Sequence, residues 1–137
     1  MKVFVDSDVI LDVILEREEF IFSQKLLDLL LTRKIAMLTS PIVFTNSFYI
    51  IRKLKGRDKA HMALKKMRKL FNVCVLNEKT IDKALASGFK DFEDAIQYYC
   101  ALESKIKYLV TRNKKDYVGD EVCVISPQEA IALFEKN

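Results

Sequence analysis

The segment Lys2–Asp12, KVFVDSDVILD, places two carboxylates directly after three apolar residues. The run at 3–5 is typical of a buried strand, and an acid gains little at the end of such a strand unless a cation or a hydrogen-bond donor lies beside it. Asp6 and Asp8 are therefore the first candidates for a chemical site. For Asp8 a second interpretation stays open, in which it only caps the helix that follows.

Further acids occur in two later motifs, DFED at 91–94 and TRNKKD at 111–116. Asp91 and Asp94 have the spacing of an N-cap and its N3 partner, so we expect Asp91 to cap a helix. Asp94 then projects from the first turn, where it can serve as a ligand. Asp116 is either a ligand or a turn-forming residue.

Carboxylates that gather in one crevice repel each other unless a cation lies between them. A ligand set of oxygens, without histidine or thiolate, selects Mg²⁺ or Mn²⁺. Such ions bind phosphate oxygens and activate water for in-line attack. The acids therefore predict metal-assisted hydrolysis of a phosphodiester, with these metal ligands: Asp6, Asp8, Asp94 and Asp116.

The elements that must position these acids follow an alternating pattern. Short apolar runs alternate with helical patterns, which indicates an α/β fold with a parallel sheet covered by helices. We expect strands at 3–5, 35–38, 73–76, 108–110 and 122–125. We expect helices at 9–15, 22–33, 41–54, 58–71, 78–88, 92–105 and 127–136. Ligands of such sheets bind beyond the carboxyl ends of the strands, which is where the acids after the first and fourth strands would lie.

Length and composition favour a single globular domain over residues 1–137, because half of the 137 residues are hydrophobic and 31% are charged. The sequence shows neither a membrane-spanning run nor a signal peptide, so we expect a cytoplasmic protein without a membrane partner. A single histidine, three isolated cysteines and three scattered glycines argue against a histidine-rich zinc site, a disulfide framework and a phosphate-binding glycine loop.

The charge is unevenly distributed. Segment Arg52–Lys69 contains nine basic residues and one acid, a local charge of +8 in a chain whose net charge is +4. A basic segment on an otherwise acidic domain suits a polyanion that approaches an acidic centre, although a solvated helix face explains the segment equally well. We take Arg52 and Lys53 from this segment, and Arg112 from the TRNKKD motif, as candidate substrate-binding residues.

Four motifs in order resemble the PIN-domain family of metal-dependent ribonucleases, which includes the toxins of VapBC-type toxin–antitoxin pairs. They are VFVDSDVILD near the start, LTSPIVFTNSFYIIRK at Leu38–Lys53, DFEDAIQYYCA at Asp91–Ala101 and LVTRNKKDY at Leu109–Tyr117. The resemblance implies a three-layer α/β/α fold with a five-stranded parallel sheet of strand order 3-2-1-4-5. It also implies single-stranded RNA as substrate, Mg²⁺ or Mn²⁺ as cofactor, a homodimer, and a cognate antitoxin protein that inhibits the site.

The resemblance assigns metal-binding roles to Asp6, Asp94 and Asp116. It assigns Thr111 and Asn113 to polar residues that orient water or ligands beside the metal. One position departs from the usual pattern. Many PIN toxins contain SPxxxxE in the third helix, with the glutamate at the metal site, whereas this chain has Asn46 at that place. An amide brings no negative charge, so we expect weaker metal binding, for which Asp8 can compensate.

Two other functions remain open. The stretch VFVDSDV also resembles the start of haloacid-dehalogenase-type phosphatases, in which Asp6 would be the nucleophile and Asp8 the general acid. This chain lacks the acidic pair that such enzymes carry after a later strand. Alternatively, Asn46 marks a catalytically weakened module that binds RNA or a partner protein without cutting. Activity that depends on metal would separate the nuclease from the binding module.

Overall fold

The computed structural model describes residues 1–18 and 20–136. Five parallel strands form one sheet in the order β3-β2-β1-β4-β5, which is the order that the resemblance implied. The strands are β1 (Lys2–Val5), β2 (Ala36–Thr39), β3 (Phe71–Val73), β4 (Tyr108–Val110) and β5 (Cys123–Ile125). Strand β1 is central and pairs with β2 on one side and with β4 on the other.

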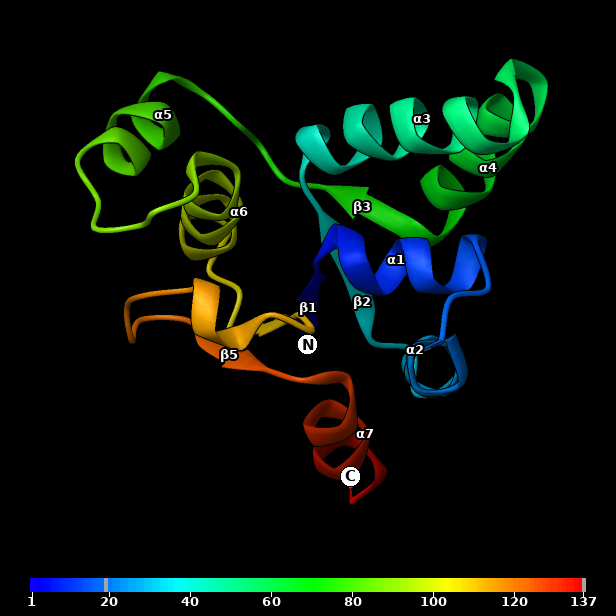
Figure 1. Cartoon of the computed structure of the whole chain (residues 1–137). Coiled ribbons are helices and arrows are strands. Elements are labelled where there is room, and N and C mark those ends of the chain that lie inside the picture. Colours follow the sequence, from blue (N-terminus) through cyan, green and yellow to red (C-terminus); the bar gives the residue numbers. More distant parts are fainter. Residues whose placement is uncertain (19, 137) are drawn as a thin grey trace.

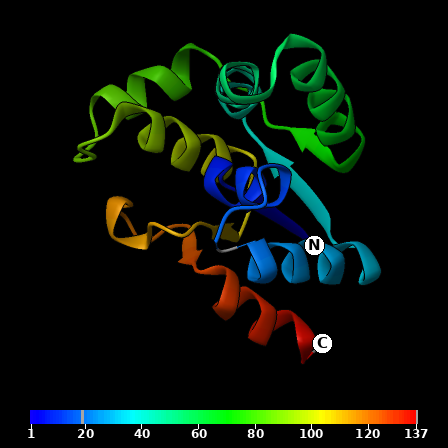
Figure 2. The same cartoon turned by 45° about the vertical axis from the view of Figure 1, so that its right-hand side comes forward.

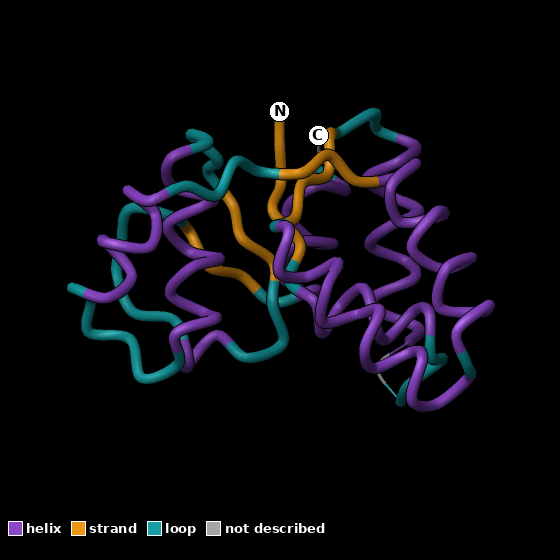
Figure 3. The backbone as a smooth tube through the Cα atoms, turned by 90° about the horizontal axis from the view of Figure 1, so that it is seen from above, coloured by secondary structure: helices purple, strands orange, loops and turns teal. Residues whose placement is uncertain are grey.

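The helices of the described residues are α1 (Ser7–Ile14), α2 (Phe20–Thr32), α3 (Pro41–Lys55), α4 (Arg57–Leu70), α5 (Glu78–Leu85), α6 (Phe92–Glu103) and α7 (Pro127–Glu135), with a 3₁₀ turn, η1 (Lys114–Asp116). Figure 3 shows the strands running through the middle with helices on both sides, which confirms the predicted α/β/α architecture. Within the described part of the chain, no helix is both long and apolar enough to cross a membrane.

In the central strand β1, the three residues that follow Lys2 are all apolar. Val3 and Val5 pack on one face of the sheet with residues of α1, α2 and α7. Phe4 points to the opposite face and packs with residues of α5 and α6. All three side chains are fully buried, because helices cover both faces. In Figure 1, α5 and α6 lie on one side of the sheet and α2 and α7 on the other, and Figure 2 shows α2 and α7 side by side.

Helices α3 and α4 form a pair that lies together at the upper right of Figure 1. They meet at Gly56, whose φ of 93° lies in a region that residues with a side chain rarely adopt. Ile51 of α3 and Ala60 of α4 are buried against Leu11 of α1. Through this contact the helical pair is fixed to the helix that follows β1.

The third strand differs from its prediction, since it comprises Phe71–Val73 and not 73–76. The reason is its place at the edge of the sheet, where only one neighbour, β2, pairs with it. Asn72 pairs with Leu38 and is exposed, so this edge strand is not the continuous apolar run that a central strand would be. Of the residues after the strand, Cys74 still donates its backbone N–H to the Thr39 carbonyl oxygen.

Candidate active site

The strand order brings two of the predicted motifs together. Asp6 directly follows β1 and Thr111 directly follows β4, and the two strands are paired in parallel. The backbone N–H of Asp6 also donates to the Val110 carbonyl oxygen at 3.0 Å. This edge of the sheet lies at the carboxyl ends of the strands, beside the central strand where the order changes direction, which is where α/β sheets bind their ligands.

Asp6 is 5% exposed and its carboxylate is held by several donors. Its Oδ2 accepts hydrogen bonds from Thr111 Oγ1 at 2.9 Å and from the Tyr117 hydroxyl at 3.0 Å. Its Oδ1 accepts from the backbone N–H of Ser7, so Asp6 is also the N-cap of α1. Burial, followed by the charge of Asp6, raises the pKa of Tyr117 far above its usual range, which keeps this hydroxyl protonated as a donor.

Asp6, and not Asp8, caps α1, which corrects the capping interpretation of Asp8. The helix therefore begins at Ser7 and not at residue 9. Asp8 Oδ2 accepts hydrogen bonds from the Thr111 hydroxyl at 3.2 Å, the backbone N–H of Arg112 at 3.0 Å and Asn113 Nδ2 at 3.0 Å. Burial and the neighbouring charge of Asp6 raise its pKa to about 6. Asp8 therefore anchors the loop after β4 to the start of α1.

Arg112 was predicted to bind substrate, but its guanidinium is engaged within the protein. Nε lies 2.7 Å from Asp12 Oδ2, and Nη2 lies 3.0 Å from Asp12 Oδ1. Asp12 is fully buried and also accepts a hydrogen bond from the Ser23 hydroxyl at 3.0 Å. This geometry gives no support to a substrate-binding role for Arg112 and indicates a role in fixing the loop. Sequence reasoning missed Asp12 because its partner is 100 residues away.

Asp91, Asp94 and Asp116 line a cavity of about 550 Å³. Asp91 caps α6, as predicted, by accepting a hydrogen bond from the backbone N–H of Asp94 at 2.9 Å. Burial, and after it the charges of four neighbouring acids, together raise the pKa of Asp94 from its usual 3.8 to about 7. These acids are Asp6, Asp91, Asp116 and Glu93. The carboxylates of three separate segments therefore act on one another.

Asn46 lies in α3 and its amide hydrogen-bonds the carboxylate of Glu93 in the first turn of α6. Burial raises the pKa of Glu93, the hydrogen bond to Asn46 lowers it, and the charges of Asp91 and Asp6 raise it. Glu93 was not among the predicted site residues. Two features of the sequence would have identified Glu93. Position 46 lacks an acid, and the DFED motif has an acid directly before Asp94.

Arg52 and Lys53 are exposed near the end of α3, where they line a shallow hollow with Tyr49. None of the acids described above lines this hollow. Arg52 and Lys53 lie six and seven residues beyond Asn46 in α3, which corresponds to a rise of roughly 10 Å along the helix axis. The structure therefore does not bring these two cations to the carboxylates, and their contact with substrate stays a prediction.

The donor chemistry fits a hard divalent cation, although no ligand cage is formed in advance. Within residues 1–18 and 20–136, no three histidine, cysteine, aspartate or glutamate side chains are placed to hold a metal ion as they stand. All available donors are oxygens, and the mutual repulsion that raises the pKa of Asp94 is the kind that a cation relieves. In addition, Asp8 Oδ1 is buried and has no hydrogen-bond partner among the described residues. The residues that could hold the ion are Asp6, Asp94 and Asp116, with Glu93 and Asp8 beside them.

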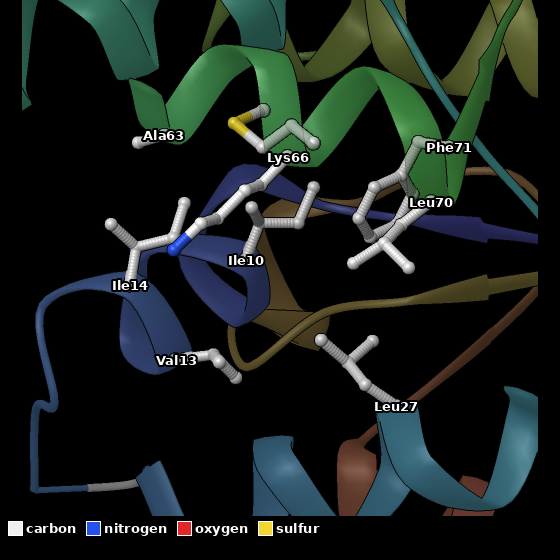
Figure 4. A pocket seen from close by; sticks show the side chains of 9 residues that line it. Ile10, Val13, Ile14, Leu27, Ala63, Lys66, Leu70 and Phe71 are labelled. Carbon is white, nitrogen blue, oxygen red and sulfur yellow. The ribbon is translucent and has the colours of Figure 1, made fainter. Parts of the chain in front are cut away.

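A second cavity, of about 310 Å³, lies between α1, α2 and α4 and shares no lining residue with the first. Its walls are apolar, with Ile10 and Ile14 of α1 on one side and Leu70 of α4 on another. Figure 4 shows the side chain of Lys66 reaching from α4 toward Ile14, so a single positive charge lies among apolar groups.

The fold and the site define a class of proteins, namely α/β domains that gather acidic side chains at the carboxyl ends of their central strands. A family model described as PIN domain matches residues 2–115, and the chain belongs to this family. The predicted resemblance is thereby confirmed, and the haloacid-dehalogenase interpretation is overturned. That residues 1–137 form a single domain stays a prediction.

Three known proteins are similar to this chain. Ribonuclease VapC1 of Aquifex aeolicus (strain VF5) is 29% identical over 134 residues, which cover 93% of this chain and 92% of the relative. A structure described as a toxin-antitoxin complex from Klebsiella pneumoniae has a TM-score of 0.67 at 20% identity, covering 91% of this chain and 97% of the other. Mycobacterium tuberculosis VapC20, described as a sarcin-ricin loop cleaving toxin, has a TM-score of 0.63 at 15% identity, covering 87% and 92%. The two structural matches support the fold.

Proposed function

We propose that this protein is a divalent-metal-dependent ribonuclease that hydrolyses phosphodiester bonds of single-stranded RNA, as the toxin of a toxin–antitoxin pair. The observation that carries the proposal is that Asp94 and Asp116, from two separate segments, line one cavity. Burial, and then the charges of neighbouring acids that include Asp6 from a third segment, raise the pKa of Asp94. Membership of the PIN-domain family supports the proposal. So does the similarity over nearly the whole chain to a relative named as a ribonuclease.

In this proposal each polar residue has a defined task. Asp6, Asp94 and Asp116 hold the cation, and Glu93 adds the negative charge that Asn46 lacks. The Thr111 and Tyr117 hydroxyls orient the Asp6 carboxylate, since both donate to its Oδ2. Bound Mg²⁺ or Mn²⁺ would polarise the phosphate and lower the pKa of a water molecule.

Thr111 and Asn113 act through Asp8. Their side chains both donate to Asp8 Oδ2, so the loop after β4 keeps its place beside the acids. This assigns Asn113 to positioning of the loop, within reach of the site. It requires no contact of Asn113 with the cation.

An antitoxin partner is the second component of the proposal, and the description of the Klebsiella pneumoniae complex supports it by similarity. The apolar cavity shown in Figure 4 offers such a partner a surface where apolar side chains would be buried. A partner segment with apolar residues and one acid beside Lys66 would fit its charge. A homodimer and a cytoplasmic location stay predictions.

Cleavage of a mixed pool of single-stranded RNA tests the ribonuclease directly. Wild type, Asp94→Asn and the matched control Asp82→Asn, an exposed acid of α5, are each incubated with Mn²⁺, Mg²⁺ or EDTA. We expect cuts by wild type and by the control with metal only, and none by Asp94→Asn. Absence of cuts by folded wild type would favour the alternative of a binding module without catalysis, for which the amide at Asn46 is the observation in favour.

A further inference from the structure

The three cations of the loop after β4 differ in their partners. Arg112 is bound to the buried Asp12, and Lys114 forms an ion pair with Glu129 at 2.7 Å. Lys115 has no ion-pair partner among the described residues, and it lines the cavity that contains Asp94. The loop therefore presents Lys115 to the cavity, while its two other cations are engaged with the protein.

A second lysine reaches the same cavity from a different segment. Lys90 precedes the N-cap of α6 and is exposed, and it too has no ion-pair partner among residues 1–18 and 20–136. In Figure 1 the segment before α6 and the loop after β4 lie on the same side of the molecule. Neither lysine is within 4.0 Å of a described carboxylate, so each ammonium group is available to an anion.

The volume and charge of this cavity suit part of a nucleic-acid chain. About 550 Å³ is within the range of 300–1,000 Å³ that is usual for ligand sites. Its wall combines Lys90 and Lys115 with acids of the candidate metal site, Asp94 and Asp116. Carboxylates alone would repel a polyanion, whereas ammonium groups beside them attract phosphates and leave the acids free for a cation.

We propose that Lys90 and Lys115 bind backbone phosphates of single-stranded RNA next to the cleaved bond, and that the cavity they line holds the adjoining nucleotide. This inference rests on the proposed ribonuclease function and specifies the path of its substrate. It differs from the path that Arg52 and Lys53 would give, because those residues line a separate hollow.

Steady-state cleavage and RNA binding by Lys90→Ala/Lys115→Ala test the path. The matched control is Lys79→Ala/Lys136→Ala, which removes two exposed lysines that do not line the cavity. We expect the first pair to raise KM at least tenfold with kcat within twofold of wild type. The control should leave both constants unchanged. Lys90→Arg/Lys115→Arg keeps the two positive charges, so its KM should stay close to the wild-type value.

Binding of a fluorescent single-stranded RNA in EDTA provides a readout that does not depend on catalysis. The plot of log K against log salt has a negative slope, and each lost phosphate contact should make this slope shallower by about 0.7. The slope of the double variant should therefore be shallower than that of wild type by about 1.4. An unchanged slope and KM, or an equal change in the control, would overturn the path. If wild type cleaves no RNA at all, the ribonuclease proposal fails, and the salt slope still decides the role of the two lysines.

Discussion

The guanidinium of Arg112 makes two hydrogen bonds to the carboxylate of Asp12, at 2.7 and 3.0 Å. Through this pair the loop after β4 is fixed to α1, the helix that follows β1. The same loop contains Thr111, whose hydroxyl oxygen lies 2.9 Å from Asp6 Oδ2 and 3.2 Å from Asp8 Oδ2, so its one proton is shared between the two carboxylates. The position of the candidate active site therefore depends on an ion pair that does not itself belong to the site.

We expect Arg112→Met to destabilise the protein, because it leaves the charge of the fully buried Asp12 without its counterion. Breaking a buried pair in this way costs about 3–5 kcal/mol, and the partial exposure of the Arg112 side chain, 31%, favours the lower end. Asp12→Leu/Arg112→Met removes both charges and should recover much of the loss. Urea unfolding of wild type, both single variants and the double variant measures the coupling. A loss below about 1 kcal/mol for Arg112→Met would contradict this role.

The raised pKa of Asp94 predicts how metal-free stability depends on pH. Its pKa is about 7 in the folded protein against a usual 3.8, so between these values the folded state binds more protons than the unfolded state. The contribution of this group to stability in EDTA should therefore be fully present below about pH 4 and should be lost as the pH rises from about 4 to about 7. Asp94→Asn should flatten this decline, measured as Tm against pH.

Metal binding should show the opposite dependence, because the cation competes with the proton on Asp94. The rise in Tm caused by millimolar Mn²⁺ should be larger at pH 8 than at pH 5. Asp82→Asn serves as the control and should respond like wild type. An equal rise at both pH values, or a rise that persists in Asp94→Asn, would remove Asp94 from the metal site.

The fold was largely predictable from the sequence, and the connections within the site were not. Helices cover both faces of the sheet, so β1 and β4 are short apolar runs that stand out from the helical patterns around them. The edge strand β3 lacks this signal, and its position was predicted two residues too late. The acids after the central strands were recognisable because a carboxylate gains little at the end of a buried strand unless a cation or a hydrogen-bond donor lies beside it. Tyr117 was missed because nothing in the local sequence indicates that its hydroxyl reaches a carboxylate 111 residues earlier.

Glu93 offers a direct test of how this chain functions without an acid at position 46. If Glu93 supplies that charge, Glu93→Gln should raise the Kd for Mn²⁺ about tenfold, equivalent to about 1.4 kcal/mol. Asn46→Glu/Glu93→Gln should restore it, because the charge then lies on the other partner of the same hydrogen bond. Calorimetric titration with Mn²⁺ measures both, with Glu78→Gln, an exposed acid in the first turn of α5, as the control. If the Kd of Glu93→Gln for Mn²⁺ equals the wild-type value, Glu93 does not supply the negative charge that is missing at Asn46.

Tyr117→Phe separates the orientation of Asp6 from its charge. The substitution keeps the buried ring but removes one of the two hydroxyls that donate to Asp6 Oδ2. A hydrogen bond to a charged acceptor contributes about 1.5–3 kcal/mol, so we expect a loss of stability in this range. We also expect a lower kcat at unchanged KM, because the carboxylate keeps its charge but loses part of its fixed orientation. Tyr49→Phe, at an exposed tyrosine of α3, is the control and should change neither. A Tyr117→Phe variant with wild-type kcat and reduced stability would restrict this hydroxyl to holding the fold together.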